Sequence, residues 1–340
     1  AADVDALAPY WFVCPQLRQT LFSPNRPDYL DLAVEKPAIK TAIYAHPEFA
    51  AFIAGMQTHF AAWQAQSAAA LKALAAGCHP KEVIVWLSEG LLAHYQDKPL
   101  IDPYHIYQHL LDYWAETMQD DLYLIAADGW KAETYRIIET DKKGKPKDKG
   151  WTCDLIPKPL IVARYYAREQ ADIDQIAAEL EAVGARLAEL EEEHGGDEGA
   201  FAELDKVNKI NVAARLREIK GDKESKDEAA VLNDWLKLNG DEADLKKRLK
   251  DAESALDALA YKHYPKLTED DIKSLVVDDK WLAALAAAIH GEMDRVSQQL
   301  TQRVKELAER YETPMPGLTA RVSALESKVS RHLERMGFAL

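Results

Sequence analysis

Two histidines and an aspartate at helical spacing are the first residues in this chain that could do chemistry. His105 and His109 lie four residues apart on an expected helix, which is the spacing of a metal-binding pair, and Asp112 follows three residues later. A metal-dependent hydrolase built on this trio is one interpretation. Ile106, however, occupies the position at which a zinc-protease motif carries its glutamate. We therefore favour an aromatic and polar core face and assign no metal ligand.

A second kind of chemistry would need the tetrapeptide with which amino-group DNA methyltransferases hold a flipped-out base: a polar residue, two prolines and an aromatic residue. Ser23-Pro24-Asn25-Arg26 and Asp102-Pro103-Tyr104 resemble it, but each has a single proline. The second is explained as a helix start, with the aspartate as the cap. The sequence also has no phosphate-binding glycine loop and no nucleophile elbow. We expect no catalytic and no cofactor-binding residue, so this chain alone is not expected to be an enzyme.

Basic side chains gather in two places, and both leave two interpretations open. A polar loop flanked by Trp130 and Trp151 carries Lys142, Lys143, Lys145, Lys147 and Lys149, and it is either a phosphate contact or a solvated loop. Residues 295–340 carry eight basic and five acidic side chains. Two sets there share a helical face each: Arg295, Arg303 and Arg310, and Arg321, Lys328 and Arg335. Ordinary flank charge of a helical seam is favoured over DNA contact, and the five lysines with Arg321, Lys328 and Arg335 remain the candidate DNA contacts.

Composition limits the class of protein. The 340 residues are 48% apolar and 29% charged, as in a globular chain, and the net charge of −15 argues against coating nucleic acid by bulk electrostatics. No apolar run approaches the roughly 20 residues of a bilayer span, so no membrane association is expected. Cys14, Cys78 and Cys153 are too few and too scattered for a disulfide framework, which indicates a reducing, cytoplasmic compartment. The absence of an initiator Met leads us to expect a piece of a longer gene product.

The first 157 residues are expected to form an aromatic-rich helical domain. Helical spacing predicts helices over Val4–Leu17, Glu48–Ala75, Glu82–Tyr95 and Asp102–Met118. The prolines of Phe22–Pro27 predict a loop. Two β-prone runs, Leu122–Ala126 and Thr134–Ile138, are separated by Asp128-Gly129 and predict a small hairpin over about 122–138.

Four apolar stripes with alternating spacings of three and four residues dominate the rest. They comprise Ile173, Ile176, Leu180, Val183, Leu187 and Leu190; Leu245, Leu249, Ala252, Leu256 and Leu259; Leu282, Leu285, Ile289, Met293, Val296, Leu300, Val304, Leu307 and Tyr311; and Leu318, Val322, Leu325, Val329, Leu333 and Met336. An amphipathic helix cannot bury its stripe alone, so each stripe must pack on another helix or on a partner.

The expected fold is mainly α. An N-terminal helical globule with a small β-hairpin precedes a long antiparallel coiled-coil or helical-bundle arm over 158–313, which turns back at His194–Gly199 and again around Asn239–Glu242. A docking helix over 314–340 then ends the chain. We predict that the fourth stripe packs against helices of a partner subunit.

Several segments are similar to the C-terminal half of methyltransferase (modification) subunits of type I restriction–modification systems. They are residues 113–121 (YWAETMQDD), 127–131 (ADGWK), 149–151 (KGW), 161–170 (IVARYYAREQ) with the heptads that follow, and 332–338 (HLERMGF). The similarity runs from about Tyr10 to the end and is most specific between Tyr107 and Gln170.

This resemblance implies a longer parent protein that transfers a methyl group from S-adenosylmethionine to adenine N6. Its cofactor loop and N-P-P-[FY] motif would lie on a preceding domain, and no position here matches them. It implies that the present part is a helical scaffold that docks the specificity subunit and helps hold DNA within the complex. The alternative, from another class, is a standalone coiled-coil scaffold that self-associates and has no DNA role.

Overall fold

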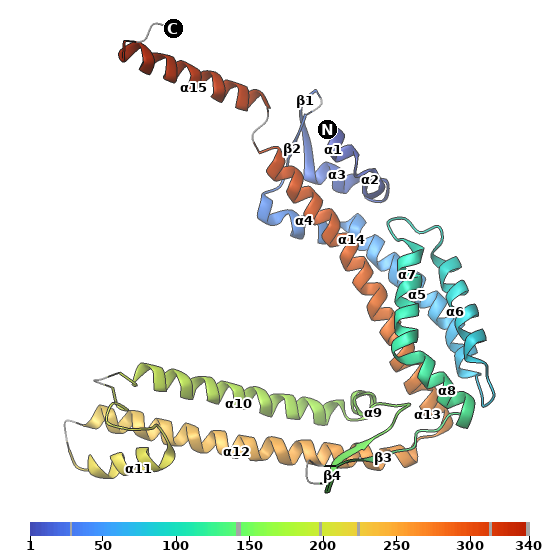
Figure 1. Ribbon diagram of the computed structural model, residues 1–340, viewed down its shortest axis with the longest axis vertical. Coiled ribbons are helices and arrows are strands. Elements are labelled where there is room, and N and C mark those ends of the chain that lie inside the picture. The colour runs from blue at the N-terminus through green and yellow to red at the C-terminus, as the bar shows by residue number, and fades with distance from the viewer. Residues whose placement is uncertain (28, 141–143, 197–198, 223–224, 313–314, 338–340) are drawn as a thin grey trace. The chain divides into compact units, whose positions relative to one another are not determined.

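The computed structural model describes residues 1–27, 29–140, 144–196, 199–222, 225–312 and 315–337. Helices dominate these residues and the strands form two small antiparallel pairs, so the expected mainly α class is confirmed. The chain divides into two compact units (Figure 1). Unit 1 comprises residues 1–129 and 277–340, and unit 2 comprises residues 130–276. These boundaries differ from those expected near residues 157 and 313.

Unit 1 begins with short helices and one strand pair and continues with longer helices. Its elements up to residue 129 are α1 (Ala2–Asp5), α2 (Ala8–Val13), α3 (Pro15–Leu21), β1 (Phe22–Arg26), β2 (Tyr29–Leu32), the 3₁₀ turn η1 (Lys36–Ala38), α4 (Ile39–Tyr44), α5 (Pro47–Lys72), α6 (Pro80–Tyr95), α7 (Pro103–Tyr113), the π-helical turn η2 (Trp114–Met118) and α8 (Gln119–Asp128).

Prolines explain where many of these helices start. Pro15, Pro47, Pro80 and Pro103 each occupy the first turn of a helix, where a backbone N–H would have no partner inside the helix. The predicted helices from Glu48 and from Glu82 are confirmed as α5 and α6. The helical spacing of Val4–Leu17 is divided among α1, α2 and α3 instead, because a proline inside a helix removes a hydrogen bond.

One loop prediction and one strand prediction were wrong. Phe22–Arg26, expected as a loop, is β1 and pairs antiparallel with β2, with Phe22 opposite Leu32. Leu122–Ala126, expected as a strand, lies in helix α8. Met118, Leu122 and Ile125 are buried at the three- and four-residue spacing of a helix. Burial of this helical face in unit 1 therefore outweighs the β propensity of the short run.

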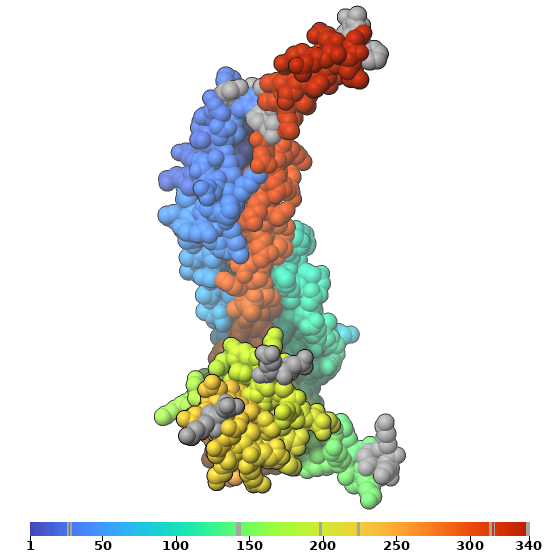
Figure 2. All heavy atoms as spheres, turned by 90° about the vertical axis from the view of Figure 1, so that its left-hand side faces the viewer, coloured from blue at the N-terminus to red at the C-terminus, as the bar shows by residue number. Residues whose placement is uncertain are grey.

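Helix α14 (Ala283–Arg310) forms the centre of unit 1. It contacts α4, α5 and α7 (Figures 1 and 2). The third stripe from Leu282 to Leu307 is buried, each member at most 4% exposed, whereas Tyr311 is 54% exposed. This stripe therefore packs on N-terminal helices and not within the expected arm.

A buried ion pair joins α8 to the segment that leads into α14. This segment is the π-helix η4 (Ser274–Leu282), in which the chain returns from unit 2 to unit 1. The Asp121 carboxylate accepts hydrogen bonds from Lys280 Nζ at 2.8 Å and from the Trp281 indole N–H at 2.7 Å. Burial raises the pKa of Asp121, while the Lys280 ammonium opposes the rise. The pair fixes the register of η4 against α8.

In unit 2, two long helices run antiparallel, α10 (Ala167–Glu193) and α12 (Lys226–His263) (Figure 1). The Trp235 indole donates to the Glu191 carboxylate at 2.8 Å near one end of the pair, and the Tyr166 hydroxyl lies 2.9 Å from His263 Nδ1 near the other. The first stripe lies in the interface, since all its members are buried or half-buried. The second stripe does so up to Leu256, but Leu259 is 41% exposed and Ala260 takes the buried position.

Smaller elements complete unit 2. They are β3 (Tyr135–Thr140), β4 (Pro146–Thr152), α9 (Lys158–Tyr165), α11 (Lys209–Glu218), the 3₁₀ turn η3 (Tyr264–Lys266) and α13 (Glu269–Lys273). Strand β3 contains most of the run predicted from Thr134 and pairs antiparallel with β4, so the hairpin covers 135–152 and not 122–138. Phe201, Val212 and Trp235 belong to a hydrophobic cluster at the end of the helix pair.

The predicted second reversal around Asn239–Glu242 does not occur. Helix α12 continues from Lys226 to His263 through Gly240. One glycine inside a helix costs only about 1 kcal/mol, and the contacts of α12 with α10 exceed that cost. Helix α10, in contrast, ends at Glu193 with His194 as its cap, at the predicted stop.

The burial of the third stripe and the exposure of the fourth predict a large difference between two matched substitutions. Leu300→Ala should lower the free energy of unfolding by about 2–5 kcal/mol, because it leaves a cavity at a fully buried position. Leu325→Ala, at a position that is 51% exposed, should change it by less than about 0.5 kcal/mol. Urea unfolding followed by circular dichroism measures both, and equal losses would contradict the described packing.

Candidate functional site

Helix α15 (Met315–Arg335) carries an apolar stripe that the rest of the described chain leaves largely exposed. Leu318, Val322, Leu325 and Val329 are 42–56% exposed, Met336 is 71% exposed and Leu333 is half-buried. The flanking cations Arg321, Lys328 and Arg335 are exposed as well. The fourth stripe thus differs from the other three, whose members are nearly all covered by the chain's own helices.

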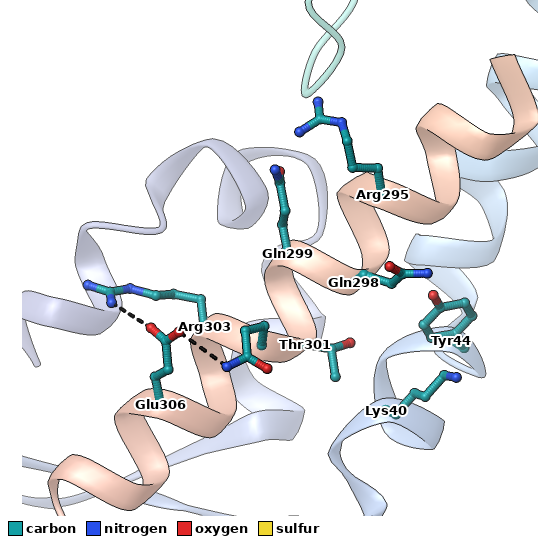
Figure 3. Close-up of a pocket in the computed structure, with 9 residues that line it drawn as sticks. Lys40, Tyr44, Arg295, Gln298, Gln299, Thr301, Arg303 and Glu306 are labelled. Carbon is teal, nitrogen blue, oxygen red and sulfur yellow. Dashed lines mark hydrogen bonds and ion pairs between the residues drawn. The ribbon is translucent and has the colours of Figure 1, made fainter. Parts of the chain in front are cut away.

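A shallow groove of about 590 Å³ lies along the exposed face of α14, beside α4. Lys40 and Tyr44 come from α4, and α14 contributes Arg295, Gln298, Gln299, Thr301, Gln302, Arg303 and Glu306. Gln298 and Thr301 lie on the side of Lys40 and Tyr44, whereas Arg303 and Glu306 lie on the other side of α14 (Figure 3). We call this feature the α4/α14 groove.

The charges of the α4/α14 groove are partly matched from within. Arg303 Nη1 lies 2.9 Å from Glu306 Oε2, and Gln302 donates to the same carboxylate at 3.2 Å. The Lys40 ammonium lies 5.6 Å from the centre of the Tyr44 ring, within cation–π range. Among the described residues, no carboxylate lies within ion-pair distance of Lys40. The lining therefore carries three cations and one anion.

Glu292 is a buried carboxylate beneath one end of this face. Its side chain is 4% exposed, and it accepts hydrogen bonds from Arg295 Nε at 2.8 Å and faces His105 Nδ1 at 3.2 Å. Burial acts to raise the pKa of Glu292, but the hydrogen bonds and charges of Arg295 and His105 together outweigh it and hold the pKa below its ordinary value. Glu292 thus anchors Arg295 and ties α7 to α14.

The histidine pair meets this carboxylate and not Asp112. His109 Nε2 lies 3.9 Å from Glu292, whereas the Asp112 carboxylate accepts a hydrogen bond from Gln108 at 2.6 Å. In the part of the chain that the structure describes, no three His, Cys, Asp or Glu side chains gather closely enough to hold a metal ion. Both histidines of α7 thus contact the Glu292 carboxylate of α14.

The five candidate lysines belong to the segment of the β3/β4 hairpin, and the structure describes three of them. Lys142 and Lys143 lie outside the described residues, while Lys145, Lys147 and Lys149 are exposed on or beside β4. Lys149 pairs with Glu139 at 3.0 Å across the hairpin. The flanking Trp151 donates its indole N–H to Asp257 at 2.9 Å and packs on Tyr264. The Trp151 side chain therefore packs within unit 2.

The two segments that resemble a base-binding tetrapeptide serve backbone structure. The Asp102 carboxylate accepts the hydrogen bond of the Tyr104 N–H at 2.9 Å and so caps α7, as predicted. Ser23 and Pro24 lie in strand β1. Neither segment fits the holding of a base beside S-adenosylmethionine, so no methyl-transfer step is derived for this chain.

Several residues that line the α4/α14 groove were not predicted from the sequence. Arg295 and Arg303 were recognised by their spacing, but Lys40, Tyr44 and the glutamines were not. Arg310, the third member of that set, instead faces Asp3 at 3.6 Å. The i, i+4 spacing of Lys40 and Tyr44 on α4 was the available signal, yet nothing in the sequence places α4 beside α14, which lies about 250 residues later.

Comparison of the chain with protein-family models, with curated proteins and with solved structures finds no match. Within the described residues, no helix combines the length and the apolar character that crossing a bilayer requires.

The lowered pKa of Glu292 predicts a pH-dependent contribution to stability. A carboxylate whose folded pKa lies below its unfolded value of about 4.3 stabilises the fold above that pH and loses this contribution as the pH falls through the folded pKa. Glu292→Gln should therefore lower the free energy of unfolding at pH 7, by about 1.5–3 kcal/mol for a hydrogen-bonded charge. The difference between variant and wild type should shrink toward pH 3 in urea titrations. A difference that stays constant with pH would contradict this role.

Proposed function

We propose that this chain is the non-catalytic C-terminal part of a type I restriction–modification DNA methyltransferase subunit. In this proposal it is a helical scaffold, and α15 docks it to helices of the specificity subunit within a cytoplasmic complex that holds DNA. The methyl donor S-adenosylmethionine and the chemistry at adenine N6 belong to the parent protein.

The observation that carries the proposal is the exposed stripe of α15. An isolated helix of about 20 residues is only marginally stable in water, and its stability in proteins comes chiefly from packing an apolar face. Apart from Leu259 and Tyr311, the members of the first three stripes are covered by helices of this chain, whereas the fourth stripe is exposed at every position except the half-buried Leu333. Covering such a face yields roughly 25 cal/mol per Å² before the costs of association and ordering, so helix–helix docking can supply affinity without ion pairs.

The segments that resemble modification subunits also support a scaffold role. Residues 113–121 span the end of α7, the turn η2 and the start of α8, where Asp121 makes its buried ion pair. Residues 161–170 span α9 and the start of α10, where Tyr166 bridges to α12. The distinctive residues at these places therefore serve packing, as expected for a portion without a reaction centre.

The test is a binding measurement on the full chain with a purified specificity subunit. Leu325→Asp with Val329→Asp should weaken binding at least tenfold, because two charges would be buried in the helix interface. Ala320→Asp with Ser327→Asp is the matched control, since it places the same charges on the opposite face of α15 at a similar cost in helix propensity. Circular dichroism should be unchanged in both.

Equal binding by the two double variants would show that the stripe does not dock the partner. Light scattering separates the self-association alternative, in which the stripe pairs with a second copy of the chain. A tight dimer at micromolar concentration that Leu325→Asp with Val329→Asp dissociates, together with no retention of the specificity subunit, would favour the standalone scaffold.

A further inference from the structure

The α4/α14 groove combines the side chains that proteins use to contact a sugar–phosphate backbone. Arginine and lysine neutralise phosphates, and glutamine, threonine and tyrosine donate hydrogen bonds to phosphate and sugar oxygens. All five types occur among the residues that line the groove. Counting Glu292, which pairs with Arg295, the groove has three cations and two carboxylates and so a net charge of +1, on a chain with a net charge of −15.

We propose that the α4/α14 groove binds the phosphate backbone of a nucleic acid. The proposal deepens the suggested function, because it names a surface through which a scaffold would meet DNA, but it does not depend on docking through α15. It also differs from the positions expected from the sequence, which were the lysine hairpin and Arg321, Lys328 and Arg335.

The spacing of the cations favours a polyanion over a compact ligand. Arg295 and Arg303 are eight residues apart on α14, which corresponds to about 12 Å along the helix axis. One DNA strand carries a phosphate about every 3.4 Å of axis, so a backbone offers charge at both ends of this span. A single small anion, in contrast, can contact only one of the two arginines. The groove is also shallow and lies along the exposed face of the helix (Figure 3), which suits an extended chain.

The cations are available to such a ligand to different degrees. Arg295 is held by the buried Glu292 and gives the groove a fixed donor. The Arg303 and Glu306 side chains are 41% and 44% exposed, and an exposed pair of this kind is worth at most about 1 kcal/mol. A phosphate can therefore replace the Glu306 carboxylate at Arg303. Lys40 lies beside the Tyr44 ring, and because no carboxylate among the described residues pairs with it, a phosphate can bind it without such an exchange.

This arrangement predicts that substitutions of neighbouring groove residues change the affinity for DNA in opposite directions. Fluorescence anisotropy with a labelled duplex of about 30 base pairs at about 50 mM salt measures binding by the full chain. Lys40→Gln with Arg303→Gln should weaken binding at least tenfold and reduce the slope of log K against log salt by about two, one for each lost phosphate contact. Glu306→Gln should strengthen binding about threefold, because it removes the competing carboxylate.

Matched controls use an ion pair of the same kind on α10. Arg186 and Glu189 form an exposed i, i+3 pair at 2.5 Å, with side chains 52% and 55% exposed. Glu189→Gln makes the same charge change as Glu306→Gln, and Arg186→Gln with Lys81→Gln matches the loss of two exposed cations. Both should leave the affinity within about twofold of wild type. Groove variants that behave like these controls would overturn the proposal.

Competitors identify the ligand. Unlabelled duplex should displace the probe, whereas inorganic phosphate and a mononucleotide should do so only at concentrations that lower binding through ionic strength. Displacement by a glutamate-rich peptide at the same charge concentration as the duplex would overturn the assignment to nucleic acid. The groove variants should retain the specificity subunit, and Leu325→Asp with Val329→Asp should retain DNA binding. Failure of one proposal is thus distinguishable from failure of the other.

Discussion

Burial of one apolar stripe, on α14, is the interaction on which unit 1 depends. A helix of 28 residues places its side chains from Leu285 to Leu307 against α4, α5 and α7, which come from the first third of the sequence. The other features of the unit follow from this packing. The buried face fixes which residues point outward, and so Arg295, Gln299 and Arg303 become a surface row. It also brings Glu292 against His105 and His109.

Charges inside unit 1 are tolerated because each has a partner from another part of the chain. Asp121 meets Lys280 and Trp281, and Glu292 meets Arg295 and His105. Burying one such group alone would cost several kcal/mol. The contacts of Asp121 and the contact of Glu292 with His105 join the N-terminal segment to the segment after residue 276. They therefore specify the alignment of two segments that hydrophobic packing alone would align less strictly.

The sequence predicted the helical class, the stripes and several caps well, since the spacing of apolar residues and the position of Pro103 depend on neighbours within one turn. It predicted poorly what depends on distant residues. Leu122–Ala126 lies in a helix because it packs in the interior of unit 1 together with Met118 and Asp121. The third stripe packs on helices from the first third of the sequence. For the same reason, only part of the α4/α14 groove could be predicted. Arg295 and Arg303 lie on one helix, so their spacing was recognised. Lys40 and Tyr44 come close to them only in the folded chain.

The discontinuity of unit 1 has a consequence for biogenesis. Residues 1–129 leave the ribosome long before α14 exists, and until then the surfaces of α4, α5 and α7 that α14 covers face solvent. Unit 2 is continuous over 130–276, so it can fold before unit 1 is complete. Chains are synthesised at about 5–20 residues per second, so the nascent N-terminal segment spends about 10 seconds or more with an open apolar face. Synthesis of α14, and not folding of residues 1–129, therefore sets when unit 1 becomes protected from aggregation and from chaperone capture.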